Sequence, residues 1–331
     1  MSILITGAAG YIGSHCARYF SEKGKDVIAL DSLETGFRES LSKDIKFYNT
    51  DIRQTESLKK IFAENNIDGV IHFAANSLVA ESVKDPFKYY YNNVYSMMML
   101  LNAMKDYDVK KIVFSSSAAV YGEPENVPIT ENDAKLPTNP YGQTKLAMED
   151  MMKWFDKAYG IRFVSLRYFN AAGAHPSGEI GEAHNPETHL IPLILQVPLK
   201  KREKVYIYGD DYNTRDGSCI RDYIHVMDLV KAHLLAFEYL GEKNAASDIF
   251  NLGSGEGFSV KEVIETAREM TGENIPSEAS QRRAGDPAVL IASSQRAEQI
   301  LGWEKEYDDL KTIITDAWRW HKNHPNGYKN A

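Results

Sequence analysis

Tyr141 and Lys145 stand four residues apart in the segment TNPYGQTK (138–145). A tyrosine has a free pKa of about 10, so it needs help to act as a base near neutral pH. A neighbouring ammonium group favours the phenolate form, and such a pair could remove the proton of a substrate hydroxyl. The spacing alone is weak evidence in a chain with 19 tyrosines. It recurs in Tyr19 with Lys23, Tyr107 with Lys111, Tyr239 with Lys243, and Tyr307 with Lys311.

The surroundings of Tyr141 distinguish it from the other four tyrosines. The segment before it, KIVFSSSA (111–118), is an apolar strand pattern that runs into three serines, and Ser117 could share the proton of a substrate hydroxyl. An Asn-Pro pair then supplies a helix cap and a first helical residue. Tyr141 and Lys145 would lie one turn apart on one face of that helix. We therefore take Tyr141, Lys145 and Ser117 as the candidate catalytic residues.

A glycine-rich turn follows the first apolar run. In TGAAGYIGSH, Gly7, Gly10 and Gly13 have the spacing G-x-x-G-x-x-G. Glycines between a strand and a helix let backbone N–H groups approach a pyrophosphate at the positive end of the helix. The position of the motif predicts a dinucleotide site.

Acidic and small residues end the next strand patterns. Asp31 lies 18 residues after Gly13, close to the spacing of an acid that binds the adenosine ribose. A carboxylate there would repel the extra phosphate of NADP, so we expect NAD. Asp51 ends the third strand pattern, where it could accept from the adenine amino group. Phe73, Ala74 and Ala75 end the fourth, where small residues would let a cofactor lie against the backbone.

These residues need a scaffold that brings strand ends together. Short apolar runs predict strands at 2–7, 26–31, 45–51, 69–75, 111–118 and 162–170, and helical patterns lie near 11–23, 55–65, 86–106 and 141–159. Nearly continuous apolar strands alternating with helices are typical of a parallel sheet covered on both faces. The sequence predicts an α/β fold with a Rossmann-type doubly wound sheet.

The pattern changes after about residue 171. Residues 171–189 are rich in Gly, Pro, Ala and His and predict a loop. The segments 221–240 and 248–255 again resemble the first domain. We expect an NAD-binding domain of 1–171 plus about 221–255, interleaved with a smaller α/β substrate domain of 172–220 plus about 256–331.

Composition excludes several classes of protein. A net charge of −8 offers no basic face for nucleic acid and disfavours an anionic membrane surface. Cys16 and Cys219 cannot form a disulfide framework. The first residues lack a signal-peptide pattern and no apolar run has the length of a membrane span, so we expect a cytoplasmic protein.

The nine histidines do not predict a metal site. His184 and His189 are five apart in a loop without a partnered acid motif, and His321 with His324 lies near the C-terminus. We expect no metal.

Longer motifs point to a family. They are TGAAGYIGSH, YYYNNV, SSSAAVYG, NPYGQTK, RYFNAAGAHPSGEIGE, DDYNTRDGSCIRDYIHVMDL and RRAGDPA. They resemble the extended short-chain dehydrogenase/reductases, and more narrowly the UDP-glucose 4-epimerases (UDP-galactose 4-epimerases), over nearly the whole chain.

The resemblance implies a role for each matching position. NAD would be surrounded by Gly7, Gly10, Tyr11, Ile12, Gly13, Asp31, Asp51, Ile52, Phe73, Ala74, Ala75, Asn92, Ser115, Tyr141, Lys145 and Tyr168. Tyr141 would be the base, Lys145 would bind the nicotinamide ribose, and Ser117 would hydrogen-bond the sugar. The UDP-sugar would lie among Ser117, Phe169, Asn170, His189, Leu190, Tyr206, Tyr208, Arg221, Arg283, Asp286 and Leu290. Guanidinium groups match a diphosphate well.

The chain departs from the family pattern in a few places. Ser77, Ser32 and His189 stand where relatives carry lysine, asparagine and asparagine. Leu290 stands where some members have a bulky tyrosine and others a small residue. We expect it to allow weak to moderate activity on UDP-N-acetylglucosamine.

The resemblance implies reversible, NAD-dependent 4-epimerisation of UDP-galactose and UDP-glucose through a 4-keto sugar, as in galactose metabolism. It also implies a homodimer formed through helices near 86–106 and 141–159. One alternative is an epimerase of another UDP-sugar, a pentose or a uronate. Others are a nucleotide-sugar 4,6-dehydratase, disfavoured by Ala118 and Ala119, and a non-catalytic NAD-binding protein.

Overall fold

The computed structural model describes residues 1–283 and 286–328. Its main sheet has seven parallel strands, in the order β11-β6-β5-β4-β1-β2-β3. Their bounds are β1 (Ser2–Thr6), β2 (Val27–Asp31), β3 (Lys46–Asn49), β4 (Ile67–His72), β5 (Lys111–Ser115), β6 (Arg162–Tyr168) and β11 (Asp248–Leu252). All predicted strands of the first half are present, and the sheet confirms the doubly wound α/β fold.

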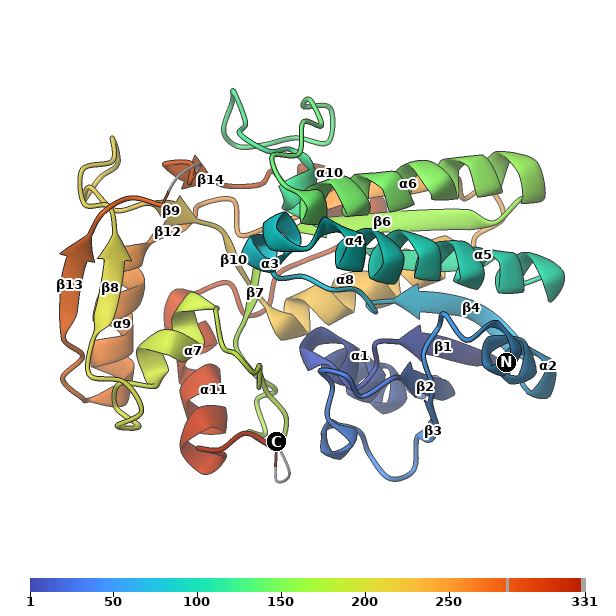
Figure 1. Ribbon diagram of the computed structural model, residues 1–331, viewed down its shortest axis with the longest axis horizontal. Helices are drawn as coiled ribbons and strands as arrows, with labels where there is room; N and C mark the ends of the chain where they lie inside the picture. The colour runs from blue at the N-terminus through green and yellow to red at the C-terminus, as the bar shows by residue number, and fades with distance from the viewer. Residues whose placement is uncertain (284–285, 329–331) are drawn as a thin grey trace.

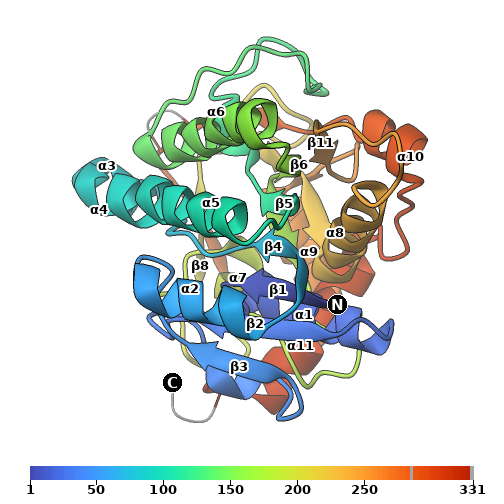
Figure 2. The same cartoon turned by 90° about the vertical axis from the view of Figure 1, so that its right-hand side faces the viewer.

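Helices cover both faces of this sheet (Figure 2). They are α1 (Tyr11–Glu22), α2 (Thr55–Glu64), α3 (Val79–Lys84), α4 (Pro86–Tyr89), α5 (Ser96–Asp106), α6 (Pro140–Tyr159), α8 (Val226–Tyr239) and α10 (Gln295–Leu301). Side chains alternate along a strand, so Ile3 and Ile5 pack towards α1 and α8 while Leu4 packs towards α2, α5 and α6. Buried apolar residues on both faces explain why the strand patterns are nearly continuously apolar.

The predicted helix at 86–106 is wrong as one regular α-helix. Between α4 and α5, Tyr90–Tyr95 forms a π-helical segment, η2. Two other short turns are 3-10 helices, η1 (Arg38–Ser40) and η3 (Ala118–Val120). The predicted strand 162–170 also ends early, because Asn170 belongs to a separate two-stranded sheet of β7 (Asn170–Ala172) and β10 (Tyr223–His225).

A smaller unit lies beside the carboxyl ends of the main strands (Figure 1). Its elements are α7 (Leu190–Leu195), β8 (Val205–Tyr208), β9 (Ile220–Arg221), β12 (Phe258–Ser259), α9 (Val260–Thr271), β13 (Ser277–Ser280), β14 (Val289–Leu290) and α11 (Leu310–Asn323). They share a separate apolar core that includes Ile194, Ile264 and Ile314. Strand β8 pairs in parallel with β13, so the unit is assembled from distant segments.

No helix within 1–283 and 286–328 is long and apolar enough to cross a membrane.

Candidate active site and cofactor site

Helix α6 places Tyr141 and Lys145 as the sequence predicts. Asn139 caps the helix, accepting a hydrogen bond of 2.9 Å from the Gly142 N–H, and Pro140 is its first residue. The Lys145 Nζ lies 5.8 Å from the centre of the Tyr141 ring. A Cβ at Gly142 would come within 2.4 Å of the Ala119 carbonyl oxygen. Glycine is therefore needed for α6 to begin directly against the turn that follows Ser117.

Lys145 is buried, with 3% of its surface exposed. Its Nζ donates a hydrogen bond of 2.7 Å to the Ser115 carbonyl and lies 4.8 Å from the centre of the Phe114 ring. Burial lowers the pKa of Lys145 to about 7, and the negative charge of Glu149 opposes that shift. The amine can therefore change charge near neutral pH, which suits a group that tunes a neighbouring tyrosine.

The Ser117 hydroxyl lies close enough to Tyr141 to influence the pKa of the tyrosine. Burial raises the pKa of Tyr141, and the Ser117 hydroxyl lowers it. Beside them, the Tyr168 hydroxyl and the Ser115 Oγ are joined by a hydrogen bond of 2.5 Å. A substrate hydroxyl between Tyr141 and Ser117 could transfer its proton to the tyrosine once positive charge nearby favours the phenolate.

The glycine-rich turn forms the cradle that a pyrophosphate needs. Gly7 has φ of +69°, and a Cβ there would lie 2.6 Å from the Ala74 nitrogen. This close approach joins the ends of β1 and β4. Among the described residues, no side chain caps the start of α1 at Gly10, so the first N–H groups of that helix remain available to an anion.

A small cavity adjoins this turn. Its lining includes Gly10 and Tyr11 from the turn, and also Thr35, His184 and Tyr328, which the sequence analysis did not assign to the cofactor. Aromatic Phe37 and Tyr328 stack 5.3 Å apart between ring centres. No local pattern marks Tyr328, because only the folded chain brings the C-terminal segment to the glycine turn. The glycine cradle and the uncapped N–H groups at the start of α1 fit the diphosphate of a dinucleotide.

The acids at the strand ends differ in their partners. Asp31 is 8% exposed and accepts hydrogen bonds from the N–H groups of Ala9 (2.9 Å) and Leu33 (2.8 Å). Burial raises its pKa, and these bonds lower it. Asp51 pairs through both oxygens with the side chain of Arg53, which lowers the pKa of Asp51. A contact between Asp51 and adenine would have to share that carboxylate, and it stays a prediction.

The other predicted cofactor residues lie at nearby strand ends or on the α4–α5 helical segment. Ile52 is buried, and the Phe73 ring lies 4.7 Å from that of His233. Asn92 donates a hydrogen bond of 3.2 Å to the Asn93 side chain, which in turn donates to Thr144 of α6 at 3.0 Å. The contact between Asn93 and Thr144 ties the π-helical segment to the helix that carries Tyr141.

The predicted UDP pocket is built from several elements of the smaller unit. Arg221 forms an ion pair with Asp286 and is the register partner of Leu290 between β9 and β14. The guanidinium carbon of Arg283 lies 4.0 Å from the centre of the Tyr208 ring. Tyr206 and Tyr208 are the two exposed residues of β8, as its alternating burial shows.

The remaining predicted substrate residues lie on the connection between the two units. Asn170 donates a hydrogen bond of 2.9 Å to the Asp222 carbonyl. Phe169 and Leu290 each pack against a small apolar cluster that includes Val120. His189 precedes α7, which Leu190 begins, but its Nδ1 contacts Glu182. The motif RRAGDPA includes positions 284 and 285, which lie outside the described residues.

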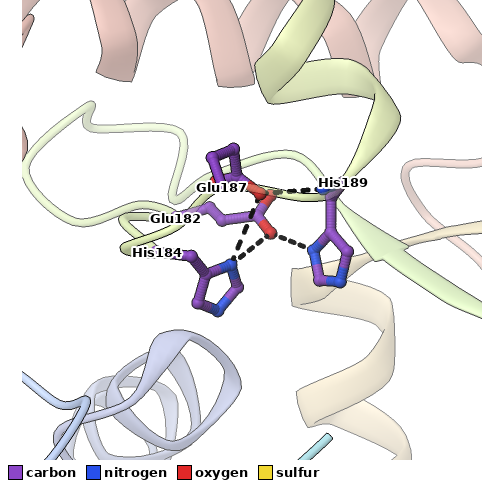
Figure 3. Close-up of side chains that lie close together, drawn as sticks. All are labelled: Glu182, His184, Glu187 and His189. Carbon is purple, nitrogen blue, oxygen red and sulfur yellow. Dashed lines mark hydrogen bonds and ion pairs between the residues drawn. The ribbon is translucent and has the colours of Figure 1, made fainter. Parts of the chain in front are cut away.

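The sequence analysis missed acids that partner two histidines. Its statement that His184 and His189 have no partnered acid is wrong, since Glu182 contacts both imidazoles and Glu187 lies beside them (Figure 3). The repeated E-x-H spacing in EAHNPETH (182–189) was the signal available.

Comparisons with known proteins show the family of the chain. The sequence model described as "NAD dependent epimerase/dehydratase family" matches residues 3–253. The chain is 60% identical to the UDP-glucose 4-epimerase of Halalkalibacterium halodurans, with 99% of this chain and 98% of that protein covered. A solved UDP-glucose 4-epimerase shares 52% identity at a TM-score of 0.98, with 100% of both chains covered. The enzyme of Bifidobacterium longum, solved in complex with NAD+ and UDP, shares 40% identity at a TM-score of 0.93, with 99% of this chain and 100% of that chain covered.

Proposed function

Because the chain belongs to the NAD dependent epimerase/dehydratase family, we propose that it is an NAD-dependent UDP-glucose 4-epimerase, an isomerase of nucleotide sugars. It interconverts UDP-galactose and UDP-glucose. The observation that carries this proposal is buried Lys145 beside the Tyr141 ring, with its Nζ bound to the Ser115 carbonyl, at the sheet edge where the glycine cradle also lies. The high identity to named epimerases over the full chain supports it.

In the proposed mechanism, each of the residues described above has a separate role in proton transfer or in cofactor binding. Tyr141 removes the proton of the sugar 4′-hydroxyl, and Ser117 hydrogen-bonds the same oxygen. When bound, NAD supplies the hydride acceptor and donor that convert carbon 4 to a ketone and back. Lys145 binds the nicotinamide ribose, and its ammonium stabilises the Tyr141 phenolate. Gly7, Gly10 and Asp31 would hold the pyrophosphate and adenosine ribose.

The UDP half of the substrate must be held firmly, whereas the hexose half must be free to rotate. Arg221, Arg283 and the exposed tyrosines of β8 would hold the UDP, since guanidinium groups pair with diphosphates and aromatic rings offer flat surfaces. The hexose must turn over between the two hydride transfers, so it is held loosely. NAD is regenerated in each cycle and should stay bound.

The test is proton NMR of the purified protein mixed with UDP-galactose and no added NAD. Conversion to UDP-glucose, reaching the same ratio from either substrate, is the expected result. No conversion after NAD is also supplied would reject the proposal for these sugars. UDP-pentoses and UDP-uronates would then be tried, followed by a nucleotide-binding assay for the non-catalytic alternative.

Substrate breadth would depend on Leu290. Leu290 is partly buried and packs against the same apolar cluster as Phe169, so a larger side chain there would narrow the space for the sugar. We expect weak to moderate activity on UDP-N-acetylglucosamine, and equal turnover of that substrate by Leu290→Tyr would contradict this role. A 4,6-dehydratase needs an extra acid and base where this chain has the apolar turn of Ala118 and Ala119.

The assembly we favour is a homodimer through α4, η2, α5 and α6. These elements expose large apolar side chains, with 77% of Phe87, 67% of Trp154 and 40% of Met98 accessible. The rings of Phe87, Tyr91 and Tyr95 stack in sequence along this face. A cytoplasmic location stays a prediction.

A further inference from the structure

The loop before α7 gathers four potential metal ligands. Glu182, His184, Glu187 and His189 each offer one ligand atom, and these atoms lie within 4.8 Å of one another (Figure 3). The proposed epimerisation assigns no chemistry to Glu182, His184 or Glu187. The cluster therefore needs a separate explanation.

Two distances in the cluster are near those between the ligand atoms of a tetrahedral metal centre. The His184 Nδ1 lies 3.1 Å from the Glu182 Oε1 and 3.7 Å from the Glu187 Oε1. The His189 Nδ1 contacts the same Glu182 oxygen. Zinc bonds of about 2.0–2.2 Å place tetrahedral ligand atoms roughly 3.3–3.6 Å apart. The direct contact between the His189 Nδ1 and Glu182 would lengthen when both atoms bind the ion, and the four side chains would then give a four-coordinate site.

The charges of the cluster also suit a divalent cation. Glu182 is 3% exposed, and an isolated carboxylate at that depth would be strongly unfavourable. With Glu187 it brings two negative charges to one place, which two imidazolium protons or one divalent ion can balance. The ion would leave both imidazoles neutral and able to coordinate.

The backbone holds these ligands in position. The Glu187 Oε1 accepts hydrogen bonds from the N–H groups of Thr188 (2.7 Å) and His189 (2.8 Å). The Glu182 carbonyl accepts one of 2.9 Å from the Trp320 indole of α11. Such outer contacts orient ligands in known metal sites.

We propose that Glu182, His184, Glu187 and His189 form a structural zinc site. Two imidazoles and two carboxylates favour zinc over magnesium or calcium, which take oxygen ligands. Four protein ligands leave no open position for a substrate or an activated water, so the site is structural and not catalytic. The resemblance placed His189 in the UDP pocket, whereas the Glu182 contact directs its Nδ1 into this cluster.

The ion would fix a loop that connects distant parts of the molecule. Upstream, the Gly173 carbonyl accepts a hydrogen bond of 2.7 Å from the Tyr11 hydroxyl of α1. The Tyr328 hydroxyl is hydrogen-bonded to Gly181 at 3.1 Å. His184 lies edge-on to Tyr11, with 6.2 Å between ring centres. Zinc would thus tie the glycine-rich turn to α11 and the C-terminal segment.

The experiment uses full-length protein without a histidine tag. Zinc is removed with a chelator and titrated back by calorimetry, and elemental analysis counts the bound metal. Cobalt(II) is titrated in parallel, because four-coordinate cobalt gives strong visible absorption. We expect one zinc ion per chain, a higher thermal midpoint in zinc, and no comparable response to magnesium.

His184→Asn is the principal variant, and we expect its zinc affinity to fall by more than about 100-fold, since loss of an outer-shell partner alone costs about 10–100-fold. His175→Asn is the matched control. His175 lies in the same loop and also faces a glutamate, with its Nε2 3.7 Å from Glu22, but it is outside the cluster. The control should bind zinc like the wild type.

Sub-stoichiometric zinc, equal affinity in His184→Asn, or an equal response to magnesium would overturn the proposal. If His184→Asn does not fold, Glu187→Gln provides the same comparison. Zinc binding is measured without substrate, so its failure is distinguishable from failure of the epimerisation assay.

Discussion

At the scale of single residues, the environment of Tyr141 decides its chemistry. Burial raises its pKa while Ser117 lowers it, and the lysine one turn away is itself buried with a pKa near 7. Near neutral pH the tyrosine alone stays protonated and the lysine is only partly charged, so formation of the phenolate depends on added positive charge, such as that of a bound cofactor. The ability to remove a proton therefore depends on Tyr141 and Lys145 together and not on either residue alone.

Removal of one hydroxyl tests the role of Tyr141. Tyr141→Phe should lower the rate of UDP-galactose epimerisation by about 10²–10⁴-fold, the usual contribution of a general base. Bound nucleotide, released by denaturation and measured by absorbance, should be unchanged. Tyr107→Phe, at an unrelated Tyr-x-x-x-Lys position, is the control for the loss of a hydroxyl. A Tyr141→Phe rate equal to the wild-type rate would remove the tyrosine from the mechanism.

Lys145 should make the stability of the nucleotide-free protein depend on pH. Its pKa in the folded protein is about 7, whereas the pKa of a free lysine is 10.5. Between these values the unfolded chain holds a proton that the folded protein lacks, so the free energy of unfolding rises with pH. The rise is at most about 1.4 kcal/mol per pH unit for one proton.

Urea unfolding of the wild type and Lys145→Met at about pH 7, 8 and 9 measures this dependence. The difference between them should grow in favour of the wild type as pH rises. Parallel curves would show that Lys145 remains charged in the folded protein.

At the scale of elements, a buried network joins α6 to β5, β6 and β11. Arg167 of β6 donates hydrogen bonds to Glu149 of α6 (2.9 Å) and to the Tyr121 hydroxyl (2.8 Å). Ser116 also donates to Glu149, at 2.6 Å. Tyr121 donates to Asn251 of β11 at 2.7 Å. This network fixes the helix one turn beyond Lys145.

Breaking the pair of Glu149 and Arg167 should be costly. Their side chains are 0% and 1% exposed, so Arg167→Met would leave a buried carboxylate and lower the free energy of unfolding by about 3–5 kcal/mol. The double variant Arg167→Met with Glu149→Leu should lose clearly less free energy of unfolding than the two single variants lose in sum. Chemical denaturation of all four proteins gives the coupling energy. Additive effects would contradict direct pairing.

An exposed ion pair on the same helix provides the control. Lys153 and Asp150 lie 2.8 Å apart with side chains half exposed. Lys153→Met should change stability by no more than about 1 kcal/mol.

Two substitutions in the glycine turn should separate an effect on NAD binding from an effect on stability. A Cβ at Gly10 would meet its nearest neighbour, the Gly7 carbonyl oxygen, at 3.4 Å, whereas one at Gly13 would approach the same atom to 2.0 Å. Gly10→Ala should fold with nearly unchanged stability but lose bound NAD. Gly13→Ala should lower the thermal midpoint. Full retention of NAD by a folded Gly10→Ala protein would contradict the pyrophosphate cradle.

At the scale of the whole molecule, the chain crosses between its two units more than once. Strand β11 returns to the edge of the main sheet beside β6 after the chain has formed β8 and β9. We accordingly propose the domain boundaries given above, with 221–255 counted in the larger domain. The helices α5 and α6 lie side by side on the outside of this domain (Figure 1).

A charge on that outer face should disrupt the proposed dimer. Trp154→Glu should raise the dimer dissociation constant by at least about 100-fold, because buried aromatic residues dominate interface energies. Sedimentation velocity over a concentration series measures it. Leu136→Glu, at a residue 69% exposed outside these helices, should leave the assembly unchanged. A wild type that sediments as a monomer would reject the dimer.

The sequence by itself determined the doubly wound fold, the glycine turn, the place of Asp31 and the pairing of Tyr141 with Lys145. These features are local: a strand, a turn and one helical repeat fix them within a few residues. Only the tertiary structure decided that Arg167 pairs with Glu149, that Tyr328 reaches the glycine turn, and that the π-helical segment interrupts the helix at 86–106. These features depend on contacts between distant segments, or on packing that overrides local helical preference, and neither leaves a periodic pattern in the sequence.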